Sequence, residues 1–375
     1  MNYEQSHRRL ISGQSIGLSA GFLRFLLSVA AMGYFLVVRL RNFLYSRGWL
    51  KVHHVDAVVI CIGNLTTGGT GKTPLVVWAC KKIISNFKSQ ISNSPCAILT
   101  RGYKAVKHSG LDTQDYSDEI AMLAESCPGA RIVVNPDRVA GGIEAINELG
   151  AKVLLMDDGF QHRRLARDLD IVTIDAMRPF GYGKMFPAGL LREPVTSLKR
   201  ANAVVITRCD QVDEVDLDML EKNLRSICSD IVIARAIHAP IYVRSVNQDN
   251  ISIEQLRDRK VFAFCGIGNP EAFLGTIRDL KCKLVGSKVF DDHHHYTKEC
   301  LADISDLAGH LDADLILTTQ KDWTKLISDF KGQISDSASP VPFVYIVIEI
   351  KFLAGEDQLT ALIESTLAGK ISEKH

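Results

Sequence analysis

The sequence predicts an α/β fold with a doubly wound parallel sheet, a second, smaller α/β domain and an N-terminal membrane-associated helix. Short apolar runs rich in β-branched residues alternate with helical patterns, which indicates parallel strands covered on both faces. A glycine-rich loop stands between the first such strand and the helix after it, and an apolar run, Phe25–Val38, precedes both. With 375 residues, 46% of them hydrophobic, the chain is long enough for two domains with buried cores.

Charge and cysteine usage narrow the class of protein. The formal net charge is +1, which argues against a generic nucleic-acid-binding protein. The nine cysteines include no Cys-x-x-Cys pair, and most stand in apolar surroundings. That pattern favours reduced thiols in a cytosolic core over disulfides or a structural zinc site.

The N-terminal segment, residues 1–50, is both apolar and basic. Arginines flank the apolar run Phe25–Val38, and no acidic residue lies between Gln5 and Asp56. A bilayer-spanning helix needs about 20 apolar residues, so this run is at the lower limit of length. The arginines favour an anchor at an anionic cytoplasmic membrane face, with the rest of the chain on that side. The alternative is a buried N-terminal helix.

The stretch Gly63–Pro74 has the features of a phosphate-binding loop. It follows the strand pattern Ala57–Ile62 and precedes the helical pattern Leu75–Phe87, which is the context that such a loop needs. Glycines let backbone amides turn toward phosphate oxygens, and the helix adds its positive N-terminal end. Lys72 would reach the β- and γ-phosphates, and the Thr73 hydroxyl would bind Mg²⁺. The predicted nucleotide-binding residues are Thr66, Thr67, Gly68, Gly69, Thr70, Gly71, Lys72 and Thr73.

The loop departs from the usual pattern in one respect. Thr66 stands where the first glycine is expected, so the core Gly68–Thr73 is similar to the deviant loop of a second branch of P-loop proteins. That branch often carries a lysine just before the paired glycines, where this chain has Thr67. A membrane-attached nucleotide switch or ATPase of that branch is therefore an alternative function.

The segment of residues 51–238 is predicted to be a P-loop nucleotide-binding core, which the family resemblance described below implies is a kinase core. Ligands of such open parallel sheets gather at the carboxyl ends of the strands. The expected strands are Ala57–Ile62, Ala97–Thr100, Arg131–Val134, Val153–Met156, Asp170–Ile174, Ala203–Thr207 and Ile231–Ala234, and the expected helices are Leu75–Phe87, Asp118–Ala124, Ala140–Glu148 and Leu217–Cys228.

The segment of residues 239–375 is predicted to be the smaller α/β domain. It opens on an alternating pattern, typical of an exposed strand or a linker, over Ala239–Val246. The serine- and proline-rich stretch 333–342 is expected to be a surface loop. The other expected elements are strands Val261–Cys265, Leu315–Thr318 and Phe343–Ile348, helices Glu271–Leu280 and Glu356–Leu367, and a turn at Gly266–Pro270.

Two adjacent acids, Asp157 and Asp158, follow the apolar strand pattern Val153–Met156. An acid at such a strand end delivers a carboxylate to Mg²⁺ directly or through water. Because neighbouring carboxylates repel one another, a nearby cation would explain the presence of both. Spacing does not decide which of the two binds the metal directly.

Three further polar motifs have structural as well as functional explanations. Asp118 and Glu119 open a predicted helix, where acids ordinarily interact with the helix dipole. The run Asp291–Tyr296 sets histidines beside carboxylates, which suits acid–base chemistry or orientation better than zinc binding. The run Thr207–Asp210 stands where P-loop GTPases read guanine, but its arginine in place of lysine argues against guanine selectivity.

Taken together, these motifs resemble the bacterial tetraacyldisaccharide 4′-kinase family. The similarity runs from about residue 20 to the C-terminus. Two of its motifs, Asp157–His162 and Pro187–Pro194, are too long and ordered for chance agreement. The motifs that carry it are Gly63–Pro74, Arg101–Tyr103, Asp118-Glu119, Asn135–Arg138, Asp157–His162, Arg167–Asp170, Pro187–Pro194 and Phe290–Tyr296.

The resemblance implies a lipid kinase. Such an enzyme moves the γ-phosphate of ATP, with Mg²⁺, to the 4′-hydroxyl of a tetraacyldisaccharide 1-phosphate in lipid A biosynthesis. It implies the cytoplasmic side of the inner membrane as the location. The expected partners are the acylated disaccharide and the membrane surface, without nucleic acid or an obligate protein partner.

The resemblance also implies roles for individual residues. The family's catalytic base corresponds to Asp118, which works with a histidine corresponding to His293, although His294 remains an alternative because three histidines are consecutive. These two and Lys72 are the catalytic candidates. Thr73, Asp157, Asp158 and Glu119 are the metal-binding candidates, and Arg101, Arg138, Arg163, Arg164 and Arg192 are candidates for binding phosphate.

Overall fold

A computed structural model describes residues 3–86, 96–102, 118–245, 249–267, 270–291, 294–329 and 340–372. The chain forms two compact units, and neither is continuous in sequence. Unit 1 comprises Met1–Arg101, Cys127–Ile237 and Ile350–His375, and unit 2 comprises Gly102–Ser126 and His238–Glu349.

The units differ from the predicted segments 51–238 and 239–375 in two places. Residues 102–126 belong to unit 2, where helix α4 (Asp118–Ser126) packs on α9 (Gln320–Asp329). Residues 350–375 belong to unit 1, because α10 (Glu356–Ser372) packs against strand β1. Both exchanges are set by packing between segments far apart in sequence, and no local pattern records them.

The sheet of unit 1 is parallel, with strand order β7-β6-β5-β1-β4-β2-β3. Every residue of β1 is buried, as expected for a central strand covered on both faces. The doubly wound prediction is confirmed. The strands are β1 Val58–Asn64, β2 Cys96–Thr100, β3 Ala130–Val134, β4 Val153–Asp157, β5 Leu169–Asp175, β6 Ala203–Thr207 and β7 Val232–Ser245.

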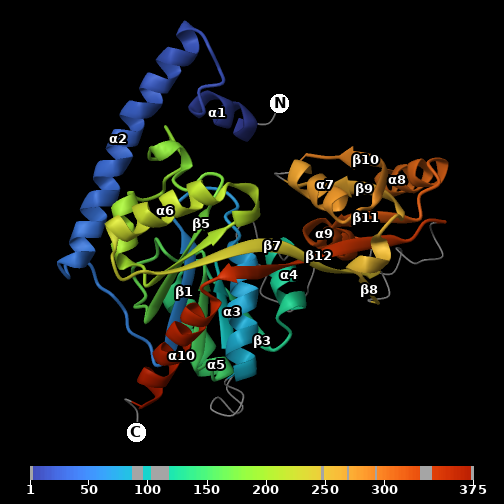
Figure 1. Ribbon diagram of the computed structural model, residues 1–375. Helices are drawn as coiled ribbons and strands as arrows, with labels where there is room; N and C mark the ends of the chain where they lie inside the picture. The colour runs from blue at the N-terminus through green and yellow to red at the C-terminus, as the bar shows by residue number, and fades with distance from the viewer. Residues whose placement is uncertain are drawn as a thin grey trace. The chain divides into compact units, whose positions relative to one another are not determined.

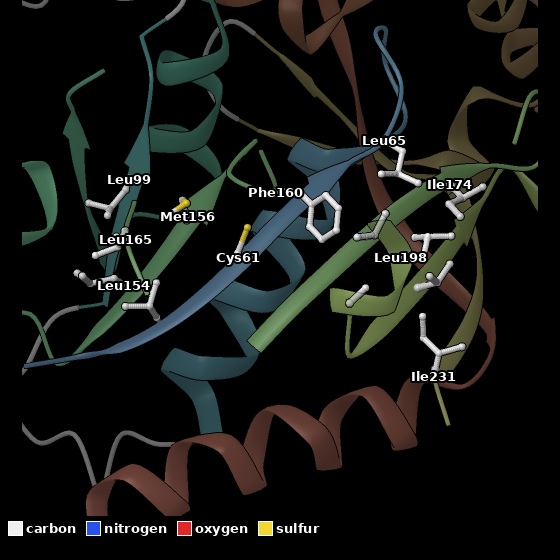
Figure 2. Packing of buried hydrophobic residues seen from close by; sticks show 14 of the residues in the cluster. Cys61, Leu65, Leu99, Leu154, Met156, Phe160, Leu165, Ile174, Leu198 and Ile231 are labelled. Atoms are coloured by element: carbon white, nitrogen blue, oxygen red, sulfur yellow. The ribbon is translucent and has the colours of Figure 1, made fainter. Parts of the chain in front are cut away.

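Helices cover both faces of this sheet. The cluster in Figure 2 packs one face against α5 (Arg138–Leu149) and α6 (Glu214–Ile227), and includes Cys61, Met156 and Phe160. Helix α3 (Lys72–Asn86) runs behind those strands and contacts β1 and β4. Three short 3₁₀ turns complete the unit: η1 Gly181–Gly183, η2 Val195–Arg200 and η3 Cys209–Gln211.

Unit 2 carries the strands β10-β9-β11-β12 in parallel, then the end of β7 with β8 antiparallel to it. Strand β10 and helices α8 and α9 lie outside the sequence prediction, and β10 is half-exposed, so its apolar signal is weak. The bounds are β8 Asn250–Ser252, β9 Lys260–Cys265, β10 Lys283–Val289, β11 Leu315–Thr319, β12 Phe343–Ala354, η4 Ile253–Leu256, α7 Pro270–Asp279 and α8 Lys298–His310.

The N-terminal part of unit 1 is helical. Helix α1 (Tyr3–Ile11) precedes α2 (Leu18–Ser46), the long blue helix of Figure 1. By length and composition alone α2 is long and apolar enough to cross a membrane, and little of its apolar stretch is buried. The helix continues beyond the predicted apolar run, and it is not a core helix.

Candidate nucleotide-binding site

The carboxyl ends of four neighbouring strands in unit 1 place the predicted polar residues at one edge of the sheet. Asp157, which ends β4, pairs in register with Ile62 of β1. Asn64, which ends β1, pairs with Thr173 of β5. Because adjacent parallel strands end at the same edge, the glycine-rich loop and the acid pair lie together, as the sequence predicts.

Buried hydroxyl and amide groups hold the glycine-rich loop. The Asn64 side chain donates to Thr70 Oγ1 at 3.0 Å, and this oxygen lies 2.8 Å from Thr173 Oγ1. Thr207 Oγ1 donates to the Thr70 carbonyl at 3.0 Å. All four side chains are buried, so the path of the loop is set before any phosphate binds.

Arg208 braces the same loop from β6. Its Nη2 donates to the Gly69 carbonyl at 2.9 Å, and its Nη1 pairs with Asp175 at the end of β5. The loop itself turns at Gly68 and Gly71, which have φ of 114° and 79°, in the region that favours glycine. The run Thr207–Asp210, which stands where P-loop GTPases read guanine, therefore supports the glycine-rich loop in this structure. Sequence spacing alone does not predict this role, because it depends on the order of the strands in the sheet.

Lys72 begins α3 and pairs with Asp158. Its Nζ lies 3.5 Å from Asp158 Oδ1, and Arg192 Nη1 donates to both oxygens of that carboxylate at 3.0 and 2.9 Å. Burial by itself would raise the pKa of Asp158, but Lys72 and Arg192 outweigh it and hold that pKa below its usual value. Two cations therefore converge on one carboxylate beside the loop.

Asp157 is 6% exposed and lies next to a buried arginine. Arg138 donates from Nη2 to the Asp157 carbonyl at 3.2 Å and from Nη1 to the Asn135 carbonyl at 2.7 Å. Burial lowers the pKa of Arg138, and the charges of Asp157 and Asp158 oppose that shift. Arg138 thus joins α5 to the end of β4.

Of the remaining candidate arginines, two make contacts within the fold. Arg163 lies over the Tyr45 ring and donates to the Asn42 carbonyl at 2.9 Å. Arg164 pairs with Asp137, the N-cap residue of α5, at 3.1 Å. Arg192 is the candidate that the structure brings to Lys72 through Asp158.

The segment before Arg192 pairs with the first half of the glycine-rich loop. The Thr67 amide donates to the Leu190 carbonyl at 2.8 Å, and the Arg192 amide donates to the Leu65 carbonyl at 2.7 Å. Thr66 and Leu191 form an antiparallel bridge between these two bonds. The segment 181–194, here called the brace segment, therefore fixes both the backbone of the loop and the cation beside it.

In unit 2, the half-buried His294 contacts three neighbouring side chains. Its ring stacks on Phe290 at 4.4 Å and meets Tyr296 edge-on at 5.0 Å, and Cys300 Sγ lies 3.8 Å from its Nε2. Burial lowers the pKa of His294. His293 lies outside the described residues.

Asp118 and Glu119 begin α4, and their side chains lie outside the described part of the chain. Arg101 is an exposed residue next to the end of its described segment. Within the described residues, no group of three or more histidines, cysteines, aspartates or glutamates is arranged to hold a metal ion.

The sequence matches the family described as tetraacyldisaccharide-1-P 4′-kinase over residues 23–368. The chain belongs to this family. The tetraacyldisaccharide 4′-kinase of Elusimicrobium minutum is 36% identical over 324 residues, or 83% of this chain and 84% of that protein. The tetraacyldisaccharide 4′-kinase of Chlorobaculum parvum is 34% identical over 367 residues, or 94% of this chain and 98% of that protein. The crystal structure of LpxK from Aquifex aeolicus in complex with ATP superposes with a TM-score of 0.71 and 26% identity, covering 92% and 99%.

Helix α1 precedes the region that matches the tetraacyldisaccharide 4′-kinase family. His7 lies 2.8 Å from the Pro187 carbonyl of the brace segment. The Arg8 guanidinium lies 3.9 Å from the point where a Cβ on Gly68 would be. Sequence patterns gave no sign of a cation from α1 beside the loop.

Proposed function

We propose that this chain transfers the γ-phosphate of ATP to the 4′-hydroxyl of a tetraacyldisaccharide 1-phosphate, a step in lipid A biosynthesis. Membership of the tetraacyldisaccharide 4′-kinase family supports the acceptor. One structural observation carries the proposal: Lys72 and Arg192 converge on Asp158 beside a pre-shaped phosphate-binding loop. Cations and backbone amides at that point would neutralise charge on the transferring phosphoryl group.

We further propose that Mg²⁺ accompanies ATP at this edge of the sheet. The oxygen donors that Mg²⁺ prefers are present in Thr73, Asp157 and Asp158, and ATP phosphates and water would complete its coordination. Asp158 is already neutralised by Lys72 and Arg192, which favours Asp157 as the direct ligand. When bound, Mg²⁺ would neutralise negative charge on the phosphates. Glu119 remains a candidate on sequence alone.

For proton transfer we propose Asp118 as the base, assisted by His293. A sugar hydroxyl is a poor nucleophile, and a positioned carboxylate would accept its proton as the new bond forms. The contacts of the His294 ring with Phe290 and Tyr296 favour His293 over His294, because the His294 ring already takes part in the packing of unit 2.

The proposed acceptor is a lipid, so we also propose that α2 attaches the enzyme to the cytoplasmic face of the inner membrane. Exposed apolar side chains along the helix include Phe22 at 63%, Phe25 at 64% and Val37 at 66%. Burying such side chains in lipid is favourable by about 25 cal/mol per Å². Washing membranes with carbonate and then detergent tests the attachment.

The activity is tested by transfer of labelled phosphate from ATP to a purified tetraacyldisaccharide 1-phosphate. We expect a labelled lipid that depends on Lys72. ATP hydrolysis that responds to a protein partner, without labelled lipid, would instead support the nucleotide-switch alternative.

The base is tested with Asp118→Ala. We expect kcat to fall by about 10²–10⁴, the usual contribution of general base catalysis, while the Kd for ATP stays unchanged. Asp118→Asn serves as the isosteric control for folding. Equal losses in kcat and in ATP affinity would remove Asp118 from this role.

A further inference from the structure

We propose that Glu193 is a positioning residue that couples helix α2 to the nucleotide-binding site of unit 1. The proposal rests on the assigned ATP site, and its membrane aspect rests on the proposed function. It concerns how Arg192 and Asp158 are held, and these residues lie on a contact path from α2 to Lys72.

Glu193 is completely buried, and α2 supplies two of its partners. Arg41 Nη2 donates to Glu193 Oε1 at 2.7 Å, and Asn42 Nδ2 donates to Oε2 at 3.1 Å. One residue earlier in the brace segment, the Arg192 carbonyl accepts a bond of 3.0 Å from the Tyr34 hydroxyl. Three side chains of one helix therefore hold two consecutive residues.

A third cation completes the pairing of Glu193. Arg200 Nη2 donates to Glu193 Oε2 at 2.8 Å, and its guanidinium lies 4.5 Å from the centre of the Phe160 ring. Burial by itself would raise the pKa of Glu193, but Arg200 and Arg41 outweigh it and keep that pKa below its usual value. Glu193 is thus ionised, and its position depends on both arginines.

Two routes lead from Glu193 to Asp158. The first is covalent, because the next side chain is Arg192, whose Nη1 donates to both Asp158 oxygens. The second runs through Arg200 and Phe160, which stands two residues after Asp158. Phe160 packs directly on the backbone of β1, since a Cβ on Gly63 would lie 2.6 Å from the Phe160 Cβ. Displacement of Glu193 would therefore change the positions of Asp158 and Lys72.

The coupling gives α2 a second task. Apart from Ala31 and Val38, the helix is half-buried or exposed along its length, so it is available to bind lipid. Lipid binding that orders α2 would also order the partners of Glu193, and through them Lys72 and Arg192 beside the glycine-rich loop. A disturbed α2 contact would weaken ATP binding even without a lipid acceptor.

The test compares Arg41→Ala with Arg39→Ala in the full chain in detergent micelles. Arg39 is exposed on α2 and lies over the Phe35 ring, so it is a matched control that removes the same charge from the same helix. We expect Arg41→Ala to raise the Kd and KM for ATP about 3–10-fold, as coupled neighbours do, and Arg39→Ala to leave both unchanged. Both variants should bind anionic phosphatidylglycerol vesicles equally.

A double-mutant cycle with Glu193→Gln identifies the pair. If Glu193 acts through Arg41, the double variant should lose no more ATP affinity than the worse single variant. Arg41→Lys keeps the charge and should recover part of the affinity. If Arg41→Ala proves unstable, Arg41→Lys alone is compared with Arg39→Ala.

The outcomes separate the two proposals. An unchanged Kd for ATP in Arg41→Ala and Arg41→Lys, or equal effects of Arg39→Ala and Arg41→Ala, would overturn the coupling. A wild-type chain that binds ATP but labels no lipid would overturn the proposed function and leave the coupling intact.

Discussion

The two units each contain a junction at which a parallel strand ends and a helix begins, and the two junctions are used differently. In unit 1, β1 leads through glycines to α3, and the polar side chains around the loop bond to its carbonyls and hydroxyl. In unit 2, β11 leads directly into α9 at Thr319–Asp322 without a glycine.

At the unit 2 junction, side chains take the place that a ligand has elsewhere. The Asp322 amide donates to Thr319 Oγ1 at 3.1 Å, and the Asp322 carboxylate accepts from that hydroxyl and from the Gly266 amide at 2.7 and 3.0 Å. Lys325 Nζ lies 3.3 Å from the same carboxylate.

The comparison shows what makes a helix N-terminus a binding site. Both junctions offer backbone amides and a positive helix end. At β11–α9 the Thr319 hydroxyl accepts from the Asp322 amide and is itself held by the buried Asp322 carboxylate, whereas at β1–α3 the acids stand at the end of the neighbouring strand β4, which leaves the loop to a ligand.

The largest expected effect is a loss of folding stability in unit 2 without a loss of ATP affinity. Asp322→Ala leaves Lys325 buried without that carboxylate, which typically costs about 3–5 kcal/mol of folding free energy. We expect Asp322→Ala to unfold at a lower urea concentration than the wild type. Below that concentration, where the variant is folded, its Kd for ATP should be unchanged. Asp303→Ala, which breaks the exposed pair with Lys288, is the control and should change the midpoint little.

The reverse pattern is expected for Lys72→Ala. The lysine's pairing with Asp158 is partly exposed, so its loss should change stability little, whereas loss of charge stabilisation should lower kcat/KM about 10²–10³-fold. Phosphate transfer and thermal unfolding are measured together. A large fall in the unfolding temperature with retained activity would contradict the contrast.

The pH response of unit 1 sharpens the comparison further. Burial and the nearby Arg138 charge lower the pKa of His162 to about 4 from 6.5. Between these values the unfolded chain binds more protons, so the stabilisation is complete above about pH 6.5 and is lost as the pH falls toward 4. We expect His162→Gln to flatten this slope in urea unfolding at pH 5 and 7. An unchanged slope would show that His162 does not cause it.

The smallest effect concerns α1. Arg8 lies beside Gly68 without a pairing carboxylate among the described residues, so Arg8→Ala should raise the Kd for ATP by about twofold to fivefold, as for one partly exposed charge. Arg24→Ala, at the start of α2, is a matched control because its guanidinium bonds to the Ser15 carbonyl. Equal effects of the two would remove α1 from the site.

Strands β1 to β6 and helices α3, α5 and α6 were predictable to within a few residues, because buried strands and amphipathic helices have strong local patterns. The loop, Lys72 and the acid pair were predictable for the same reason. Strand β7 was harder, because one strand of Val232–Ser245 covers two separate predictions and passes from unit 1 to unit 2. Helix α9 was missed because the polar Gln320–Asp322 start hides its apolar positions.

By itself, the sequence determined the parallel sheet, the phosphate-binding loop, the apolar N-terminal helix and the kinase family, since each is written in contiguous residues. Only the tertiary structure decided that Arg192 reaches Asp158, that Arg208 braces Gly69 and that Glu193 pairs with Arg41 of α2. These contacts span 34, 139 and 152 positions of the chain. Such pairs depend on which strands become neighbours, and that is a result of packing the whole unit.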